Sequence, residues 1–205
     1  MSTLTGITDI LDFWFGAAAD SNTVAARQSA LWWSKDSAID ADIKARFATT
    51  MEAASNNQLD DWADTPDGML ALILLFDQFP RNSYRNTAQA FAFDELARQC
   101  CHLGLALGFD QQLSLLQRVF FYLPLEHSED PDDQDHAVHL LNTLASTATK
   151  QDPTVKALFD NFANYGRRHQ HIIARFGRFP HRNAILARPS TAEEVAFLQE
   201  PGSSF

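Results

Sequence analysis

Residues 65–82 read TPDGMLALILLFDQFPRN, and this stretch decides the fold class. Thr65 is typical of a helix N-cap, and Pro66 is typical of the first helical position. The next residues, 69–76, are apolar without interruption, which predicts a helix buried on every face. Pro80 disfavours helical backbone at Phe79, so the sequence predicts that this helix ends near Gln78.

Helical signals recur on both sides of this stretch, and no sustained period-two alternation indicates a strand. No linker or low-complexity segment divides the chain. We therefore expect one all-α domain over residues 1–205, built from antiparallel helical hairpins. The other predicted helices cover residues 8–15, 25–33, 36–54, 87–107 (ended by Gly108), 112–122 (closed by Pro124), 130–149, 152–175 and 191–198.

The composition excludes several classes of protein. With 45% hydrophobic residues the chain resembles ordinary globular proteins rather than disordered ones. A net charge of -10 argues against nucleic acid as a partner. Two cysteines cannot form a disulfide scaffold or a four-thiolate zinc site. Cys100 and Cys101 are adjacent, so we expect reduced core thiols rather than a disulfide.

The sequence also bears on location. Residues 1–20 contain no Lys or Arg and include Asp9 and Asp12, which is unlike a secretory signal. The longest apolar run, residues 69–76, is far shorter than the ~20 residues of a membrane span. We expect a cytoplasmic protein with no membrane partner.

Asp77 is the first candidate for chemistry. It follows a run that predicts burial, and it lies near the negative end of a helix dipole, so it needs a cation. Arg81 and Arg85 are nearest in sequence. A buried ion pair that locks the turn would explain the pattern structurally, whereas Asp77 could instead hold Arg81 toward a ligand.

The segment LEHSED at residues 125–130 is the second candidate. Helix capping explains Asp130 but does not require Glu126, His127 or Glu129. A histidine between two carboxylates is pushed toward its charged form and suits acid/base chemistry. Solvated charge around a helix start is the structural alternative. The spacing fits no metal signature.

A basic segment and a short echo form the third candidate. Residues 161–192 contain six Arg, three His and no acid, which indicates either an intramolecular partner for the acidic body or an anion site. FDQFPRN at 76–82 resembles FGRFPHRN at 176–183, either as a reused helix stop or as paired functional turns. The aromatic pairs around Trp14 and Trp32 predict core packing, but an exposed aromatic wall beside the Arg cluster would indicate a binding surface.

These motifs resemble a known family. ILDFWFG at 10–16, WWSKD at 32–36, residues 74–82 and YLPLEHSED at 122–130 are similar to the bacterial domain-of-unknown-function family numbered 924. The ending FPHRN at 179–183 and residues 188–198 also fit. The resemblance implies an all-helical fold akin to tetratricopeptide proteins, with degenerate repeats. It implies no established activity or cofactor.

We therefore predict one polar pocket where the two Phe-Pro turns and the 126–130 loop converge. It would bind an anionic small molecule, with His127 and Glu129 as tentative acid/base residues for hydrolysis or proton transfer. One alternative is a peptide-binding module with a helical groove. Another is that these motifs only tie helices together. The predicted ligand-binding residues are Asp77, Arg81, Asn82, Glu126, His181, Arg182 and Asn183.

Overall fold

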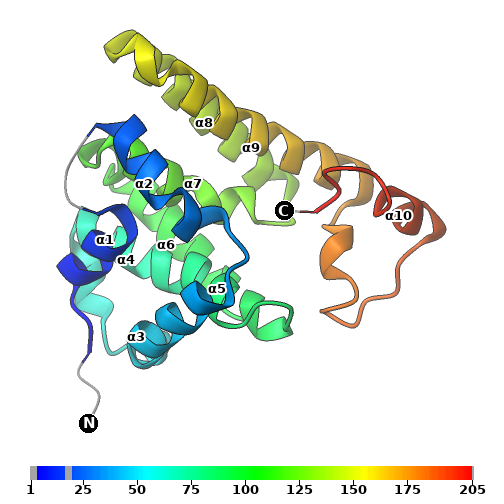
Figure 1. Ribbon diagram of the computed structural model, residues 1–205, viewed down its shortest axis with the longest axis horizontal. Coiled ribbons are helices and arrows are strands. Elements are labelled where there is room, and N and C mark those ends of the chain that lie inside the picture. The colour runs from blue at the N-terminus through cyan, green and yellow to red at the C-terminus, as the bar shows by residue number, and fades with distance from the viewer. Residues whose placement is uncertain (1–3, 17–19, 205) are drawn as a thin grey trace.

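The structure, a computed structural model, describes residues 4–16 and 20–204 (Figure 1). Within these ranges every regular element is helical, which confirms the all-α class. The α-helices are α1 (Ile7–Phe15), α2 (Ser21–Trp33), α3 (Ser37–Ser55), α4 (Pro66–Ile73), α5 (Phe79–Ser83), α6 (Asp94–Ala106), α7 (Leu115–Glu126), α8 (Pro131–Gln151), α9 (Lys156–Phe176) and α10 (Ala192–Phe197). Shorter helical turns are η1 (Asp60–Asp64), η2 (Leu74–Gln78), η3 (Ala88–Phe91), η4 (Asp110–Gln112), η5 (Pro153–Val155) and η6 (Pro180–Arg182).

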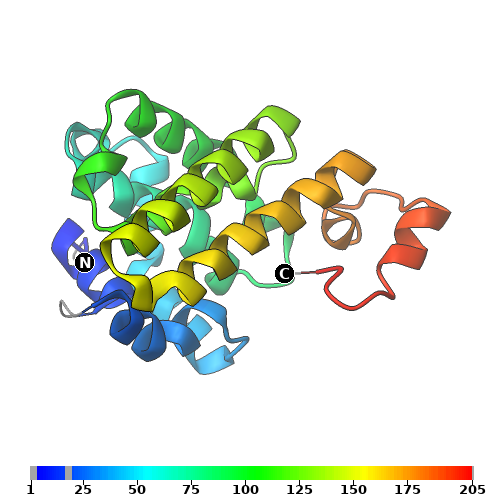
Figure 2. The ribbon, with the colours of Figure 1, turned by 90° about the horizontal axis from the view of Figure 1, so that it is seen from above.

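The longest helices, α8 and α9, form an antiparallel hairpin that lies across the rest of the molecule (Figures 1 and 2). Helix α7 packs against both of them. On its other side α7 contacts α4, which in turn packs against α1 and α6. Helix α10 lies beyond the end of α9, at the far edge of the molecule (Figure 2). Within the described residues no helix combines the length and the apolarity that a membrane crossing requires.

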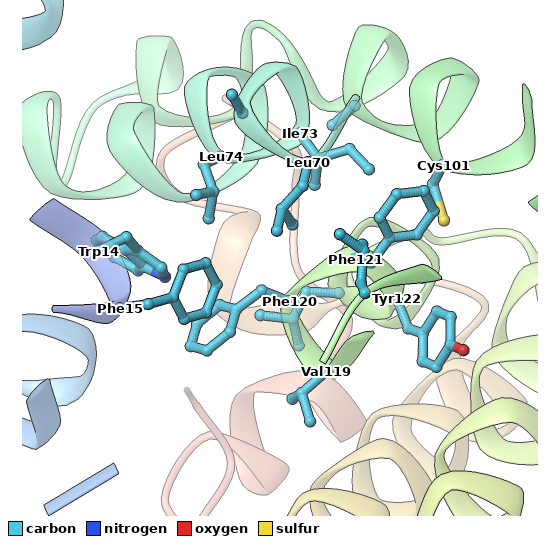
Figure 3. Close-up of a cluster of buried hydrophobic side chains, with 14 of the residues drawn as sticks. Trp14, Phe15, Leu70, Ile73, Leu74, Cys101, Val119, Phe120, Phe121 and Tyr122 are labelled. Carbon is cyan, nitrogen blue, oxygen red and sulfur yellow. The ribbon is translucent and has the colours of Figure 1, made fainter. Parts of the chain in front are cut away.

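Aromatic side chains join the amino-terminal helices to α7. The ring of Phe120 lies 5.7 Å from that of Trp14 and 5.4 Å from that of Phe15, measured between ring centres. Figure 3 shows these rings facing Leu70 and Leu74 across the core. Burial of this much apolar surface is the main driving force for a helical fold of this size. Core packing is therefore the role of this aromatic cluster.

The predicted helix end near Gln78 is wrong. The chain passes from α4 through a single π-helical turn, η2, directly into α5, and Pro80 lies in the first turn of α5. The N–H of Phe79 donates to the carbonyl of Leu74, five residues back, instead of four. Proline has no N–H group, and the first turn of a helix does not need one. The wider π-helical turn before α5 therefore accommodates Pro80. Helix continues because every residue of η2 is buried.

Further boundaries differ from the prediction: α2 begins at Ser21 rather than at residue 25, and α9 begins only at Lys156, after the turn η5. Residues 87–107 do not form one helix, and α6 begins only at Asp94. The hydroxyl of Thr87 donates to the carbonyl of Tyr84 instead of capping a helix. Pro124 does not close α7, which continues to Glu126. Proline costs the carbonyl of residue 120 a partner, but the buried residues around it hold the helix in place.

Other expectations are confirmed. Helix α8 begins at Pro131 with Asp130 as its cap, and Thr191 forms a capping box with Glu194 at the start of α10. Cys101 is buried and Cys100 is half-buried, and both are free thiols.

Candidate functional site

Asp77 lies in the π-helical turn η2 and is 1% exposed. Its carboxylate lies 2.7 Å from Nδ1 of His127 and 3.2 Å from Nη2 of Arg81. Gln78 also donates to it. Burial alone would raise the pKa of Asp77, but the charge of Arg81 and the hydrogen bonds from His127 and Gln78 outweigh it and hold the pKa well below its ordinary value. Asp77 is therefore an ionised, buried anchor. π-Helical turns occur often at functional sites.

Arg81 and Arg182 meet at a shared carboxylate. Arg81 Nη1 lies 2.7 Å from Oδ1 of Asp94, and Arg182 Nη1 lies 3.4 Å from its Oδ2. Both guanidinium groups also lie over the ring of Phe91, at 5.6 and 4.8 Å. Burial and the nearby charge of Arg81 lower the pKa of Arg182 to about 10. The Asp94 carboxylate therefore holds the two guanidinium groups side by side.

Each of these arginines has one buried nitrogen that makes no hydrogen bond. Within the described part of the chain, Nη2 of Arg81 and Nε of Arg182 are buried without a hydrogen-bond partner. Nη2 of Arg81 is within ion-pair distance of Asp77 but does not point along a hydrogen bond. Arg182 is only 6% exposed. Both atoms are buried, so they face the surrounding protein, and the other guanidinium nitrogens of the two arginines are the ones available to the cleft.

His127 ends α7 and has a defined tautomer. Because the ionised Asp77 accepts a hydrogen bond from Nδ1, that nitrogen carries the proton and Nε2 carries the lone pair. Burial lowers the pKa of His127; Asp77 opposes this shift and Arg81 adds to it. The imidazole is therefore neutral at pH 7, as a general base must be.

Glu126 and His169 form a second buried pair beside His127. Oε1 of Glu126 lies 3.0 Å from Nδ1 of His169, which also donates to the carbonyl of Tyr165 at 2.9 Å. Burial and the charge of Asp77 raise the pKa of Glu126 to about 8. Burial lowers the pKa of His169. At neutral pH Glu126 is thus mostly protonated, and it is a proton donor.

These groups line one cleft of about 1210 Å³. It is open to solvent, and its cationic lining includes side chains from distant parts of the sequence. Glu126 is the one acidic side chain among the described residues that line it. The acidic partners Asp77 and Asp94 lie behind the arginines. The charged, histidine and aromatic lining residues are Trp32, Trp33, Lys35, Arg81, Arg85, Phe91, Glu126, His127, Phe162, Tyr165, Arg168, His169, His181 and Arg182.

The predicted site residues separate into two groups. Arg81, Glu126, His127, His181 and Arg182 line the cleft, and Asp77 supports them from behind. Burial and Arg182 lower the pKa of His181 to about 4. The predicted convergence of the two Phe-Pro turns on the 126–130 loop therefore matches the geometry.

Three predicted residues are used elsewhere. Asn82 touches the cleft, but its amide donates to Asp40. Glu129 lies 2.6 Å from Arg188 and also accepts from the backbone N–H of Phe179, so it ties the 126–130 loop to the carboxyl-terminal segment.

Asn183 is fully buried, donating to Ser190 and accepting from Arg188. The carboxylate that orients His127 is Asp77 rather than Glu126 or Glu129.

Sequence reasoning missed Asp94 and His169. Asp94 follows an irregular turn and carried no motif, and only its place between two arginines reveals its role. His169 stood in the basic segment, and its spacing from His171 argued only against a metal pair. Its partner, Glu126, lies on a different helix. Among the described residues no cluster of three or more His, Cys, Asp or Glu could hold a metal ion.

Comparison with known proteins agrees with the fold. A family model described as "Bacterial protein of unknown function (DUF924)" matches residues 10–202. A solved structure, that of the protein of unknown function ATU0120 from Agrobacterium tumefaciens, is 38% identical, with a TM-score of 0.77. The alignment covers 94% of this chain and 96% of that one. No curated protein matches the chain. Since the family model spans nearly the whole sequence, the chain belongs to the DUF924 family.

Proposed function

We propose that this protein binds an anionic small molecule, a carboxylate or a phosphate, between Arg81 and Arg182. The observation that carries the proposal is that the guanidinium groups of Arg81 and Arg182 line a cleft together with three further cations, Lys35, Arg85 and Arg168, while Glu126 is the one acidic side chain among its described lining residues. An anion there would receive charge-assisted hydrogen bonds from both groups. It would also relieve the repulsion between them.

We further propose hydrolysis or proton transfer by His127. Its Nε2 would take a proton from water, and the water oxygen would bond to the carbonyl carbon or phosphorus of the substrate. The leaving group would depart with its electron pair and receive a proton from the Glu126 carboxyl. Asp77 would hold the imidazole in its tautomer and stabilise the imidazolium that forms. Glu129, fixed by Arg188, has no part in this scheme. On the sequence grounds above we place the activity in the cytoplasm.

Anion binding is tested by calorimetry with inorganic phosphate and with acetate. We expect Arg182→Gln to raise the Kd at least tenfold, since a charge-assisted hydrogen bond contributes about 1.5–3 kcal/mol. Arg175→Gln is the matched control, because Arg175 pairs with Glu193 on the surface outside the cleft. Arg182→Lys keeps the charge in case the glutamine variant fails to fold. Equal affinity in all four proteins, or no binding to wild type, would refute the proposal.

The chemical step is tested with p-nitrophenyl acetate and p-nitrophenyl phosphate. His127→Gln should abolish turnover while leaving phosphate binding within a few-fold of wild type. The rate should rise with pH through a midpoint below 6.5, because burial lowers the pKa of His127. Turnover that survives in the variant would assign His127 to binding alone.

A second candidate function is peptide binding by a tetratricopeptide-like array of hairpins. The observation that favours it is that Ser204, in the carboxyl-terminal segment of this chain, lies in the lining of the cleft, which supports the view that the cleft accepts a peptide segment. In that case acidic peptides would bind more tightly than phosphate, and Arg182→Gln would weaken both.

A further inference from the structure

The cleft is larger than an anionic headgroup needs. Its volume of about 1210 Å³ exceeds the ~300–1,000 Å³ typical of small-molecule pockets. Besides the cationic residues, its lining contains small and apolar side chains, among them Ala25, Ala26, Val119, Leu123, Leu158 and Phe162. The uncharged polar residues Asn22, Ser29 and Asn161 lie among them. The ligand therefore has a second, apolar part to account for.

Helix α7 contributes one face that changes character along its length. Val119, Leu123, Glu126 and His127 follow at intervals of four, three and one residues, so all four lie on the same side of the helix. Figure 3 shows Val119 in the buried core, pointing away from Leu70 and Ile73. The cleft face of α7 is thus apolar first and polar last.

Helix α9 repeats this order. Its lining residues begin with Leu158, Asn161 and Phe162 and end with Tyr165, Arg168 and His169, so the charged residues again come last. His169 lies beside His127, with ring centres 6.0 Å apart, so the polar ends of α7 and α9 meet. The two helices therefore form an apolar channel that opens onto the arginines.

Helix α2 completes the channel. Its first residues lie beside the start of α9, where Asn22 donates to the carbonyl of Thr154 at 3.2 Å. It contributes Ala25 and Ala26 and ends at the cationic side, where Arg85 donates to the carbonyl of Ser34. Helix α2 therefore lies along the cleft from the start of α9 to the cationic side.

The ring of Trp33, the last residue of α2, forms part of the lining of the cleft. This ring stacks on Phe120 at 5.9 Å with an angle of 15° and also contacts Phe162 at 6.3 Å. It is nevertheless 52% exposed, which is unusual for a tryptophan packed on two aromatic rings. This exposed ring lines the cleft that holds the arginines, so its open surface is available to a ligand.

We propose, resting on the function proposed above, that the ligand is an amphiphilic anion with a linear aliphatic chain. The carboxylate or phosphate binds at Arg81 and Arg182, and the chain runs past Trp33 toward the Asn22–Thr154 end. From Val119 to His127 the helix rises about 12 Å. With carbon–carbon bonds of about 1.5 Å, a zigzag chain of roughly eight to ten carbons spans this length.

An aliphatic chain fits this channel better than a nucleobase. The side chains of Val119, Leu123 and Leu158 have no hydrogen-bonding atoms, and a base needs partners for its polar edge. Asn22, at the far end, is already bonded to Thr154. An aliphatic chain has no polar atoms, so its burial leaves no ligand atom without a hydrogen-bond partner.

The test measures chain-length dependence by calorimetry with butanoate, hexanoate and octanoate, and with butyl and octyl phosphate. Each methylene that leaves water tightens binding about fourfold, so octanoate should bind on the order of a hundredfold more tightly than butanoate. The carboxylate and phosphate series decide which headgroup the arginines prefer. Adenosine monophosphate serves as a flat aromatic anion and should bind no better than butyl phosphate.

Two matched variants place the chain. Ala26 is exposed on α2 and lines the channel, whereas Ala30 is exposed on the same helix outside it. Ala26→Phe should weaken octanoate at least tenfold and leave butanoate unchanged. Ala30→Phe should change neither.

The possible outcomes separate this inference from the proposed function. If butanoate and octanoate bind equally, the headgroup site stands and the aliphatic channel is refuted. Tighter binding of adenosine monophosphate than of octyl phosphate would refute the aliphatic chain in favour of a ring on Trp33. If no anion binds wild type, both proposals fall together.

Discussion

The role of Asp77 as a buried anchor predicts the effect of Asp77→Asn. The variant keeps the shape of the side chain and removes its charge. Asp77 is 1% exposed and contacts two cationic or cation-forming groups, Arg81 at 3.2 Å and His127 at 2.7 Å, besides Gln78. Asparagine can accept at one oxygen only, so one of these donors loses its acceptor altogether.

The magnitude follows from these contacts. A hydrogen bond to a charged group contributes about 1.5–3 kcal/mol and a neutral one about 0.5–1.5 kcal/mol. At two of the contacts the charged acceptor becomes a neutral one, which costs about 1 kcal/mol each. The third donor is left without an acceptor, which costs about 1 kcal/mol more. Arg81 keeps Asp94 as a partner at 2.7 Å, so the total stays below the ~3–5 kcal/mol of a fully broken buried pair. We expect a loss of about 2–3 kcal/mol in the free energy of unfolding.

Urea denaturation at pH 7, followed by circular dichroism, measures this loss. Asp160→Asn is the control, because Asp160 forms an exposed i,i+4 pair with Lys156, and such pairs contribute less than ~1 kcal/mol. A loss below about 0.5 kcal/mol for Asp77→Asn would show that Asp77 is not an ionised anchor. So would a loss equal to that of Asp160→Asn.

The pH dependence gives a second check. The folded state depresses the pKa of Asp77 below its ordinary value of 3.8, so the native carboxylate binds its proton less tightly than the unfolded one. The stabilisation is therefore complete above about pH 4 and is lost as the pH falls further. The difference between wild type and Asp77→Asn should shrink as the pH falls below 4.

Three further predictions concern buried groups. Folding raises the pKa of Glu126 from 4.5 to about 8, so wild type loses stability as the pH rises through that window; Glu126→Gln should remove this slope and be the more stable protein at pH 8 by urea denaturation. Gly104→Ala should lower the free energy of unfolding by about 1–3 kcal/mol, because its Cβ would overlap the ring of Phe121; an unchanged urea midpoint would contradict the tight packing of α6 on α7. Burial raises the pKa of Cys101 well above its ordinary value, so a thiol reagent at pH 8 should label it only after denaturant is added.

Much of the fold could be predicted because local chemistry decides it. Asp130 followed by Pro131 marks a helix start wherever it occurs, and the structure begins α8 there. The prediction was wrong where burial overrides local preference. Pro80 and Pro124 both lie inside helical stretches, because the surrounding apolar residues keep the helix intact.

The candidate site could be predicted in part for a similar reason. Asp77 stood out because a carboxylate in an apolar run requires a cation, and Arg81 four residues later lies on the same helix face. Partners across the fold carry no such signal. Glu129 resembled a partner for the neighbouring His127, yet it binds Arg188, fifty-nine residues away.

The sequence by itself determined the all-helical class, most helix starts and the polar residues that collect in the turns, since these depend on neighbours within four residues. Only the tertiary structure decided which of those residues meet. It set Asp94 between Arg81 and Arg182, paired Glu126 with His169, and aligned α2, α7 and α9 along one cleft. Such meetings depend on how helices pack, and packing is a property of the whole core rather than of any one segment.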